Sequence, residues 1–123
     1  MKFDDLSNKV IGCALNVHRE LGPVLLESTY EQCLCYELSK AGIQFERQKE
    51  LPVRYQEVQI DCGYRIDLLI EGALIIELKS VDKLERIHEA QLLTYMKLSN
   101  IEIGLLINFN SVLLRDGIRR MVL

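Results

Sequence analysis

The stretch from Ala73 to Phe109 constrains the fold of this chain more than any other. It begins with "ALIIELKSV", an apolar run of strand length, and continues through "HEAQLLTYMKLS", which has helical spacing. It ends with "EIGLLINF", which predicts a second buried strand. Two strands that are joined by a helix usually lie parallel in one sheet. The stretch therefore predicts a parallel crossover within a mixed sheet.

The rest of the chain predicts two helices followed by consecutive strands. Apolar residues recur at helical spacing from Leu6 to Leu21 and again over residues 25–41. The segments "IQFERQKELPVRY", "EVQIDC" and "YRIDLLI" have period two and predict strands in an antiparallel meander, with Pro52 favouring an edge or a break in the first. A last strand is expected in "GIRRMVL". The predicted fold is mixed α/β, in the order α-α-β-β-β-β-α-β-β, and forms a single domain over residues 1–123.

The composition limits the classes of protein to which the chain can belong. Hydrophobic residues make up 49% and charged residues 27%, which indicates a globular protein and not a disordered one. The net charge of −3 counts against a uniformly basic nucleic-acid binder, but not against a local basic patch. The sequence contains neither a membrane-length apolar run nor a signal-peptide core, so we expect a cytoplasmic protein that does not bind membranes.

Three charged side chains interrupt the apolar strand pair "IDLLIEGALIIELKS". Asp67 lies on the first strand, while Glu77 and Lys79 are two apart on the second and project to one face. A plain ion pair is one explanation, and it is common for exposed charges. A magnesium site is the other, because two close carboxylates repel unless a cation neutralises them and Mg²⁺ prefers oxygen ligands. Lys79 would then hold a phosphate oxygen or an attacking water beside the ion.

The pairing register decides whether Asp67 and Glu77 can share one ion. If Glu71-Gly72 were a two-residue loop, Asp67 would face Ile76 and the two carboxylates would lie on opposite faces. A shared ion therefore requires a three-residue loop or a bulge near Asp67.

Two helices carry further polar candidates. Gln91 and Tyr95 are four apart and share a helix face, with His88 one turn earlier. A solvent-facing side of an amphipathic helix also explains these positions, and it is the better explanation for His88. In the second helix, Glu27 lies one turn before Glu31. Glu27 also suits the first turn of a helix, where the helix dipole favours an acid.

Together these residues resemble the pattern of the PD-(D/E)XK nuclease superfamily, which has a restriction-endonuclease-like fold. That pattern combines a helix glutamate, a strand acid, Glu-x-Lys on the next strand and Gln-x-x-x-Tyr on a helix. More narrowly, the chain is similar to the GxxExxY family through "LLESTYEQCLCYEL", "GYRIDLL", "IIELKSV", "HEAQLLTYMKL" and "GLLINF". The first glycine of that motif is Val24 here, so we expect the loop before the second helix to differ locally. The matching positions are Glu27, Asp67, Glu77, Leu78, Lys79, Gln91 and Tyr95.

The resemblance implies a metal site at the sheet edge. Asp67 and Glu77 would ligate Mg²⁺ or Mn²⁺, helped by the backbone carbonyl of Leu78. Glu27 would reach the ion directly or through water. The implied activity is metal-dependent hydrolysis of phosphodiester bonds in DNA or RNA, so nucleic acid is the implied partner.

The resemblance also implies roles for three catalytic residues that are not metal ligands. Lys79 would position the attacking water or stabilise the charge that develops on the phosphate. Gln91, with Tyr95 behind it, would orient Lys79 or bind the nucleic-acid backbone.

Two alternatives stay open. The first is a non-catalytic nucleic-acid-binding or protein-assembly module on the same fold, which the acidic net charge favours. The second is a structural homodimer, because so hydrophobic a small chain leaves apolar surface to cover. The complete set of candidate residues favours catalysis instead.

Overall fold

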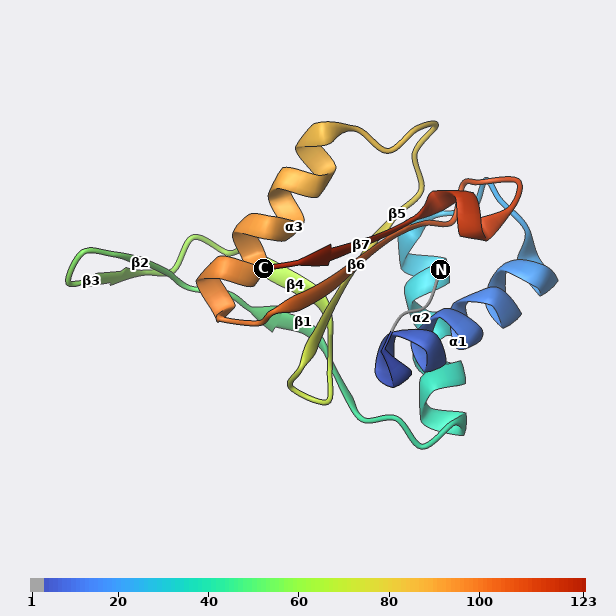
Figure 1. The fold of residues 1–123 in the computed structure, drawn as a ribbon, viewed down its shortest axis with the longest axis horizontal. Helices are drawn as coiled ribbons and strands as arrows, with labels where there is room; N and C mark the ends of the chain where they lie inside the picture. The colour runs from blue at the N-terminus through green and yellow to red at the C-terminus, as the bar shows by residue number, and fades with distance from the viewer. Residues whose placement is uncertain (1–3) are drawn as a thin grey trace.

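The computed structural model describes residues 4–123 and arranges them in three layers (Figure 1). A five-stranded sheet lies between α1 and α2 on one face and α3 on the other. The helices are α1 (Asp5–Leu21), α2 (Glu27–Lys40), α3 (Arg86–Ser99) and the short 3-10 helix η1 (Leu114–Gly117). The strands are β1 (Phe45–Glu50), β2 (Val53–Tyr55), β3 (Val58–Ile60), β4 (Arg65–Ile70), β5 (Leu74–Lys79), β6 (Ile103–Asn108) and β7 (Ile118–Val122). The predicted mixed α/β class is therefore confirmed.

Side-chain caps define where two of the helices begin. Asp4 accepts a hydrogen bond of 2.9 Å from the backbone N–H of Ser7 and so caps α1. At the start of α3, the Nδ1 atom of His88 accepts the backbone N–H of Glu85 at 2.9 Å, which completes a capping box. This contact gives His88 a structural role.

No helix within residues 4–123 has the length and apolar character needed to cross a membrane.

The sheet has the strand order β1-β4-β5-β6-β7. β5 and β6 pair in parallel, with α3 between them in the chain, which confirms the predicted crossover. The other neighbours in this sheet pair antiparallel.

The predicted meander is wrong in one respect. β1 pairs with β4, whereas β2 and β3 form a separate two-stranded hairpin that projects from the body of the molecule (Figure 1). The first predicted strand breaks at Leu51-Pro52, because proline cannot donate a hydrogen bond to a sheet. The region between α2 and α3 therefore contains one strand more than predicted.

The two faces of the sheet bury separate hydrophobic clusters. On the α1 and α2 side, the ring of Tyr30 stacks on Phe109 with 4.4 Å between centroids, and both side chains are fully buried. On the other side, α3 buries Leu92 and Met96 against the sheet. The helices that carry the candidate residues are thus fixed by packing on opposite faces.

The loop before α2 overturns one expectation. Val24 has φ 74°, in the left-handed region that a glycine adopts easily and that a β-branched residue rarely adopts. Its backbone N–H donates to the Oδ1 atom of Asn110 at 3.0 Å. The loop therefore keeps a backbone conformation suited to glycine although valine occupies the position.

Candidate active site

The candidate site lies where β4 and β5 separate. Their pairing runs from Ile70 opposite Leu74 to Leu68 opposite Ile76 and then stops. Beyond this point β4 continues to pair with β1, and β5 continues to pair with β6. The two inner strands therefore form a fork, and Asp67 and Glu77 are the first residues inside it.

The loop between these strands has three residues, which confirms the register that a shared site requires. Glu71 and Gly72 both have positive φ, and the N–H of Ala73 donates to the carbonyl of Ile70 at 2.9 Å. The register places Asp67 opposite Glu77. The expected position at the sheet edge is wrong, because these residues lie on inner strands.

Each carboxylate in the fork accepts a backbone hydrogen bond from the opposite strand. The N–H of Leu78 donates to Oδ2 of Asp67 at 2.8 Å, and the N–H of Asp67 donates to Oε2 of Glu77 at 2.9 Å. These bonds satisfy N–H groups where regular strand pairing ends. They also hold both carboxylates in fixed positions.

Burial gives this pair unusual protonation behaviour. Glu77 is only 4% exposed, and burial, followed by the charge of Asp67, raises its pKa to about 8. Burial also raises the pKa of Asp67, although the N–H of Leu78 and the amide of Gln48 oppose this shift. Two adjacent buried carboxylates resist being charged together, and a divalent cation would remove that penalty. The oxygen donors of this pair therefore fit a hard cation such as Mg²⁺.

A chain of hydrogen bonds links Lys79 to α3. The Nζ atom of Lys79 donates to Oε1 of Gln91 at 3.2 Å, and Nε2 of Gln91 donates to the hydroxyl of Tyr95 at 3.3 Å. The charge of Lys79 opposes the pKa increases of Asp67 and Glu77, so the ammonium lies within electrostatic reach of both. The structure thus brings these three predicted residues together beside the carboxylate pair.

Glu27 lies within electrostatic reach of the carboxylate pair, because its charge adds to the raised pKa of Glu77. It is exposed at the start of α2, where its Oε2 atom accepts the N–H of Ser80 at 3.3 Å. Within residues 4–123, no three side chains of His, Cys, Asp or Glu form a metal-binding group. Direct ligation by Glu27 and by the Leu78 carbonyl therefore stays a prediction.

Sequence reasoning missed Gln48 and gave Glu31 no role. The Nε2 atom of Gln48 lies 2.6 Å from Oε1 of Glu31 and 3.3 Å from Oδ1 of Asp67, so it donates to both carboxylates. Arg47 donates from Nε to Oε2 of Glu31 at 2.7 Å. Only the pairing of β1 with β4 brings Gln48 to Asp67, and no local pattern indicates that pairing.

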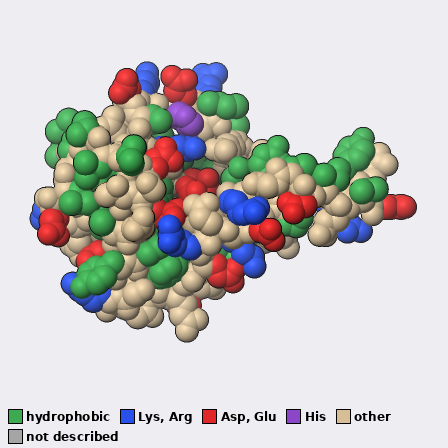
Figure 2. Space-filling model, turned by 180° about the vertical axis from the view of Figure 1, so that it is seen from behind, with side chains coloured by type: hydrophobic (Ala, Val, Ile, Leu, Met, Phe, Trp, Pro, Cys, Tyr) green, Lys and Arg blue, Asp and Glu red, His purple; other side chains and the backbone are tan. Residues whose placement is uncertain are grey.

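Two hollows of the surface include candidate residues from the helices. Figure 2 shows acidic side chains gathered towards the middle of one face, with lysine and arginine side chains close by. One hollow of about 370 Å³ includes Glu27 and Ser80, and another of about 400 Å³ includes Gln91 and Tyr95.

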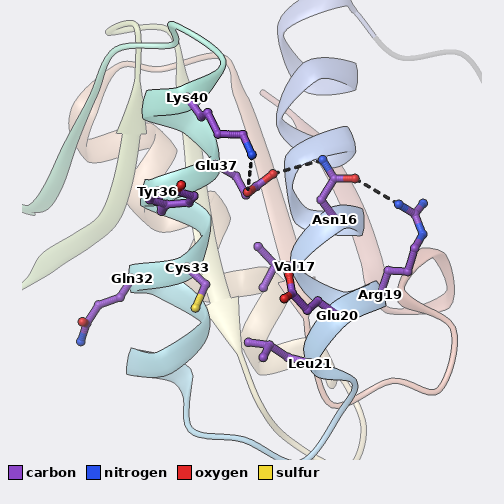
Figure 3. A pocket seen from close by; sticks show the side chains of 10 residues that line it. All are labelled: Asn16, Val17, Arg19, Glu20, Leu21, Gln32, Cys33, Tyr36, Glu37 and Lys40. Atoms are coloured by element: carbon purple, nitrogen blue, oxygen red, sulfur yellow. Dashed lines mark hydrogen bonds and ion pairs between the residues drawn. The ribbon is translucent and has the colours of Figure 1, made fainter.

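Another cavity lies away from the candidate site, between α1 and α2 (Figure 3). It has a volume of about 640 Å³ and includes Val17, Leu21, Cys33 and Tyr36 in its lining. Its polar contacts are hydrogen bonds and an ion pair among side chains of the two helices. None of the candidate catalytic residues lines it.

Residues 4–121 match the family described as the PD-(D/E)XK nuclease superfamily. The mixed sheet with three helices is consistent with the predicted restriction-endonuclease-like fold. Searches of curated proteins and of solved structures found no match.

Proposed function

Because the chain belongs to the PD-(D/E)XK nuclease superfamily, we propose that it is a metal-dependent nuclease that hydrolyses phosphodiester bonds of DNA or RNA. One observation carries this proposal: the fork between β4 and β5 holds two facing carboxylates, and the Lys79 ammonium lies within electrostatic reach. Nucleases of this superfamily generally use divalent metals, which this donor pair fits.

Asp67 and Glu77 would hold Mg²⁺ or Mn²⁺, with the carbonyl of Leu78 and with Glu27 as further oxygen donors. Mg²⁺ commonly binds one or two carboxylates and completes its coordination with water and phosphate oxygens, so two carboxylates suffice. The ion would offset charge on the phosphate and make water a better nucleophile.

Lys79 is the residue that we assign to the reacting phosphate. Its Nζ atom would donate a hydrogen bond to a phosphate oxygen or hold the attacking water in line. Gln91 accepts from the same ammonium and so fixes its direction, while Tyr95 fixes Gln91 in turn. The three residues would therefore act as one unit in the reaction.

Cleavage assays test this function. Labelled single- and double-stranded DNA and RNA are incubated with the protein in Mg²⁺, Mn²⁺ or EDTA. We expect cleavage in at least one metal, and Lys79→Ala should lower its rate about 100–1000-fold, as expected for loss of a donor that stabilises developing charge. Lys9→Ala is the matched control, because Lys9 is an exposed lysine on α1.

Metal binding is measured separately from cleavage. Mn²⁺ should raise the Tm of the wild-type protein, because the ion binds the folded carboxylate pair. Asp67→Asn should lose most of this increase. A wild-type protein that shows neither cleavage nor a Tm increase would overturn the proposal.

An assembly module is a second candidate, which the β2–β3 hairpin favours. Two of its cross-strand pairs, Val53 with Ile60 and Tyr55 with Val58, share one face, so that face of the hairpin is apolar. Tyr55 is 64% exposed and Val58 is 59% exposed. A homodimer through this face would cover it. Light scattering that gives a monomer mass would contradict the homodimer.

We also propose that residues 1–123 act as one domain of the GxxExxY family, in the cytoplasm. Tyr30 supports the narrower assignment, because its hydroxyl donates to the carbonyl of Gly22 and accepts the N–H of Leu25, which fixes the loop before Glu27. The four free cysteines suit a reducing compartment.

A further inference from the structure

The side-chain amide of Gln48 lies between two carboxylates from different elements. Its Nε2 atom donates to Oδ1 of Asp67 on β4 and to Oε1 of Glu31 on α2. The other oxygen of Asp67 already accepts the N–H of Leu78. Both oxygens of the Asp67 carboxylate are therefore held by defined donors, and the rotation of this group is restricted.

The backbone of Gln48 is unusual for a residue within a strand. Its φ is 49°, in the left-handed region that glutamine seldom adopts. The neighbouring pairs, Arg47 with Leu68 and Lys49 with Ile66, place Gln48 opposite Asp67. Such conformations persist where the surrounding structure determines them, and they cluster at functional sites. Here the hydrogen bonds from the Gln48 side chain to Glu31 and Asp67 stabilise this backbone conformation.

Glu31 anchors the amide from the α2 side. It is 6% exposed, and Arg47 occupies its second oxygen through a contact of 2.7 Å. Both oxygens of Glu31 therefore accept hydrogen bonds from residues of β1, one from Arg47 and one from Gln48. Gln48 thus connects a buried, neutralised carboxylate to the carboxylate in the fork.

We infer that Gln48 is a positioning residue, which Glu31 anchors, and that it orients the Asp67 carboxylate for a divalent cation. This inference rests on the proposed function and adds two residues to it. With the Gln48 amide at Oδ1 and the Leu78 N–H at Oδ2, the Asp67 carboxylate is held in one orientation, and each oxygen keeps a lone pair that can bind a cation. Residues that hydrogen-bond to metal ligands commonly change metal affinity 10–100-fold when they are replaced.

Gln48→Gly tests the inference, because glycine accepts a positive φ and removes only the amide side chain. Isothermal titration with Mn²⁺ should show binding weaker by about 10–100-fold than in the wild type. The Tm in EDTA should stay equal or rise, since the backbone strain is relieved. Gln48→Asn is a second variant; asparagine also tolerates a positive φ, but its amide is one methylene shorter.

Gln56→Gly is the matched control. Gln56 also has positive φ, 55°, but it lies in the turn of the β2–β3 hairpin, so its replacement should leave Mn²⁺ affinity unchanged. A double-mutant cycle with Glu31→Gln then tests the anchor. If Glu31 acts through Gln48, Glu31→Gln should weaken Mn²⁺ binding in the wild type and change it little in Gln48→Gly.

The outcomes separate this inference from the proposed function. Unchanged Mn²⁺ affinity in Gln48→Gly, beside a wild type that binds Mn²⁺ and cleaves, overturns the inference alone. Additive effects of Glu31→Gln and Gln48→Gly overturn the role of Glu31 as the anchor. A wild type that neither binds Mn²⁺ nor cleaves overturns the proposed function and this inference together.

Discussion

The protonation of Glu77 makes the stability of the folded protein depend on pH. Its pKa rises from the ordinary 4.5 to about 8, first through burial and then through the charge of Asp67. Between these two values the unfolded chain has released the proton, while the folded protein still holds it. The free energy of unfolding must therefore fall as pH rises through this window.

The first prediction compares Glu77→Gln with the wild type in EDTA. The wild-type Tm should fall between pH 5 and pH 8 relative to that of the variant, whose amide does not titrate. Thermal unfolding followed by circular dichroism across this range measures the difference. Glu57→Gln, at an exposed position in the hairpin turn, is the control. Parallel curves for wild type and Glu77→Gln would show that Glu77 is ionised at neutral pH in the folded protein.

At the level of elements, Gly104 sets how closely α3 approaches the sheet. A Cβ atom at this position on β6 would lie 2.8 Å from Sδ of Met96 and 2.9 Å from Cδ1 of Leu92. Both distances are shorter than van der Waals contact allows, so a larger residue must move the Met96 and Leu92 side chains, and it shifts α3 where these side chains do not repack. Gln91 and Tyr95 lie on the same helix, so a shift of α3 would move them too.

The second prediction is that Gly104→Ala destabilises the protein and weakens catalysis. Overpacking costs about 1–3 kcal/mol in unfolding free energy, which urea titration measures. Cleavage should fall by more than the lost folded fraction explains, because Gln91 moves relative to Lys79. Gly12→Ala is the control, since nothing lies within 4 Å of its added Cβ in the interior of α1. That change should stabilise the protein by about 0.5–1 kcal/mol. Equal cleavage by wild type and Gly104→Ala would contradict the effect on α3.

The elements that sequence reasoning predicts well are those decided by local periodicity. The three helices and the β5–α3–β6 crossover follow from helical spacing and from apolar runs of strand length. The separate β2–β3 hairpin does not follow from local periodicity, because a period of two predicts a strand but not the strand with which it pairs. Pairing depends on contacts between distant residues, such as Phe45 with Ile70.

The same distinction applies to the site. Asp67, Glu77 and Lys79 stand out in the sequence because charges interrupt apolar strands. The register argument requires a three-residue loop or a bulge near Asp67, and the structure has the three-residue loop. Gln48 gives no such signal, since a polar residue with solvent on one side is ordinary in a strand. Its contact with Asp67 depends on the β1–β4 pairing and on a positive φ that glutamine rarely adopts. Tertiary structure alone reveals it.

At the level of the whole molecule, charge works against binding a polyanion. The net charge is −3, and the fork presents two acidic groups where a phosphate would approach. Three basic residues near the site are in ion pairs: Arg47 with Glu31, Lys49 with Glu46 and Arg65 with Glu50. A cation in the fork would reverse the local repulsion, so nucleic-acid binding should depend on the metal.

The third prediction is that Ca²⁺, a hard cation with oxygen ligands, strengthens nucleic-acid binding relative to EDTA. Fluorescence anisotropy with labelled DNA and RNA gives the Kd in a salt series. The logarithm of affinity should fall linearly with the logarithm of salt concentration, by about 0.9 for each duplex phosphate contact. We expect some of the basic residues nearest the site in sequence to make these contacts, and Arg47, Lys49 and Arg65 would first have to leave their ion pairs. These basic residues are Arg47, Lys49, Arg54, Arg65, Lys79, Lys83, Arg86 and Lys97.

Asp67→Asn separates the two electrostatic contributions to this binding. The variant loses one carboxylate of the fork, so the gain from Ca²⁺ should largely vanish, while the salt dependence from lysine and arginine contacts should persist. Equal wild-type affinity in Ca²⁺ and in EDTA would mean that the phosphate backbone does not approach the fork. Binding that is absent at every salt concentration would instead favour assembly through the apolar face of the hairpin, where Tyr55 and Val58 are exposed.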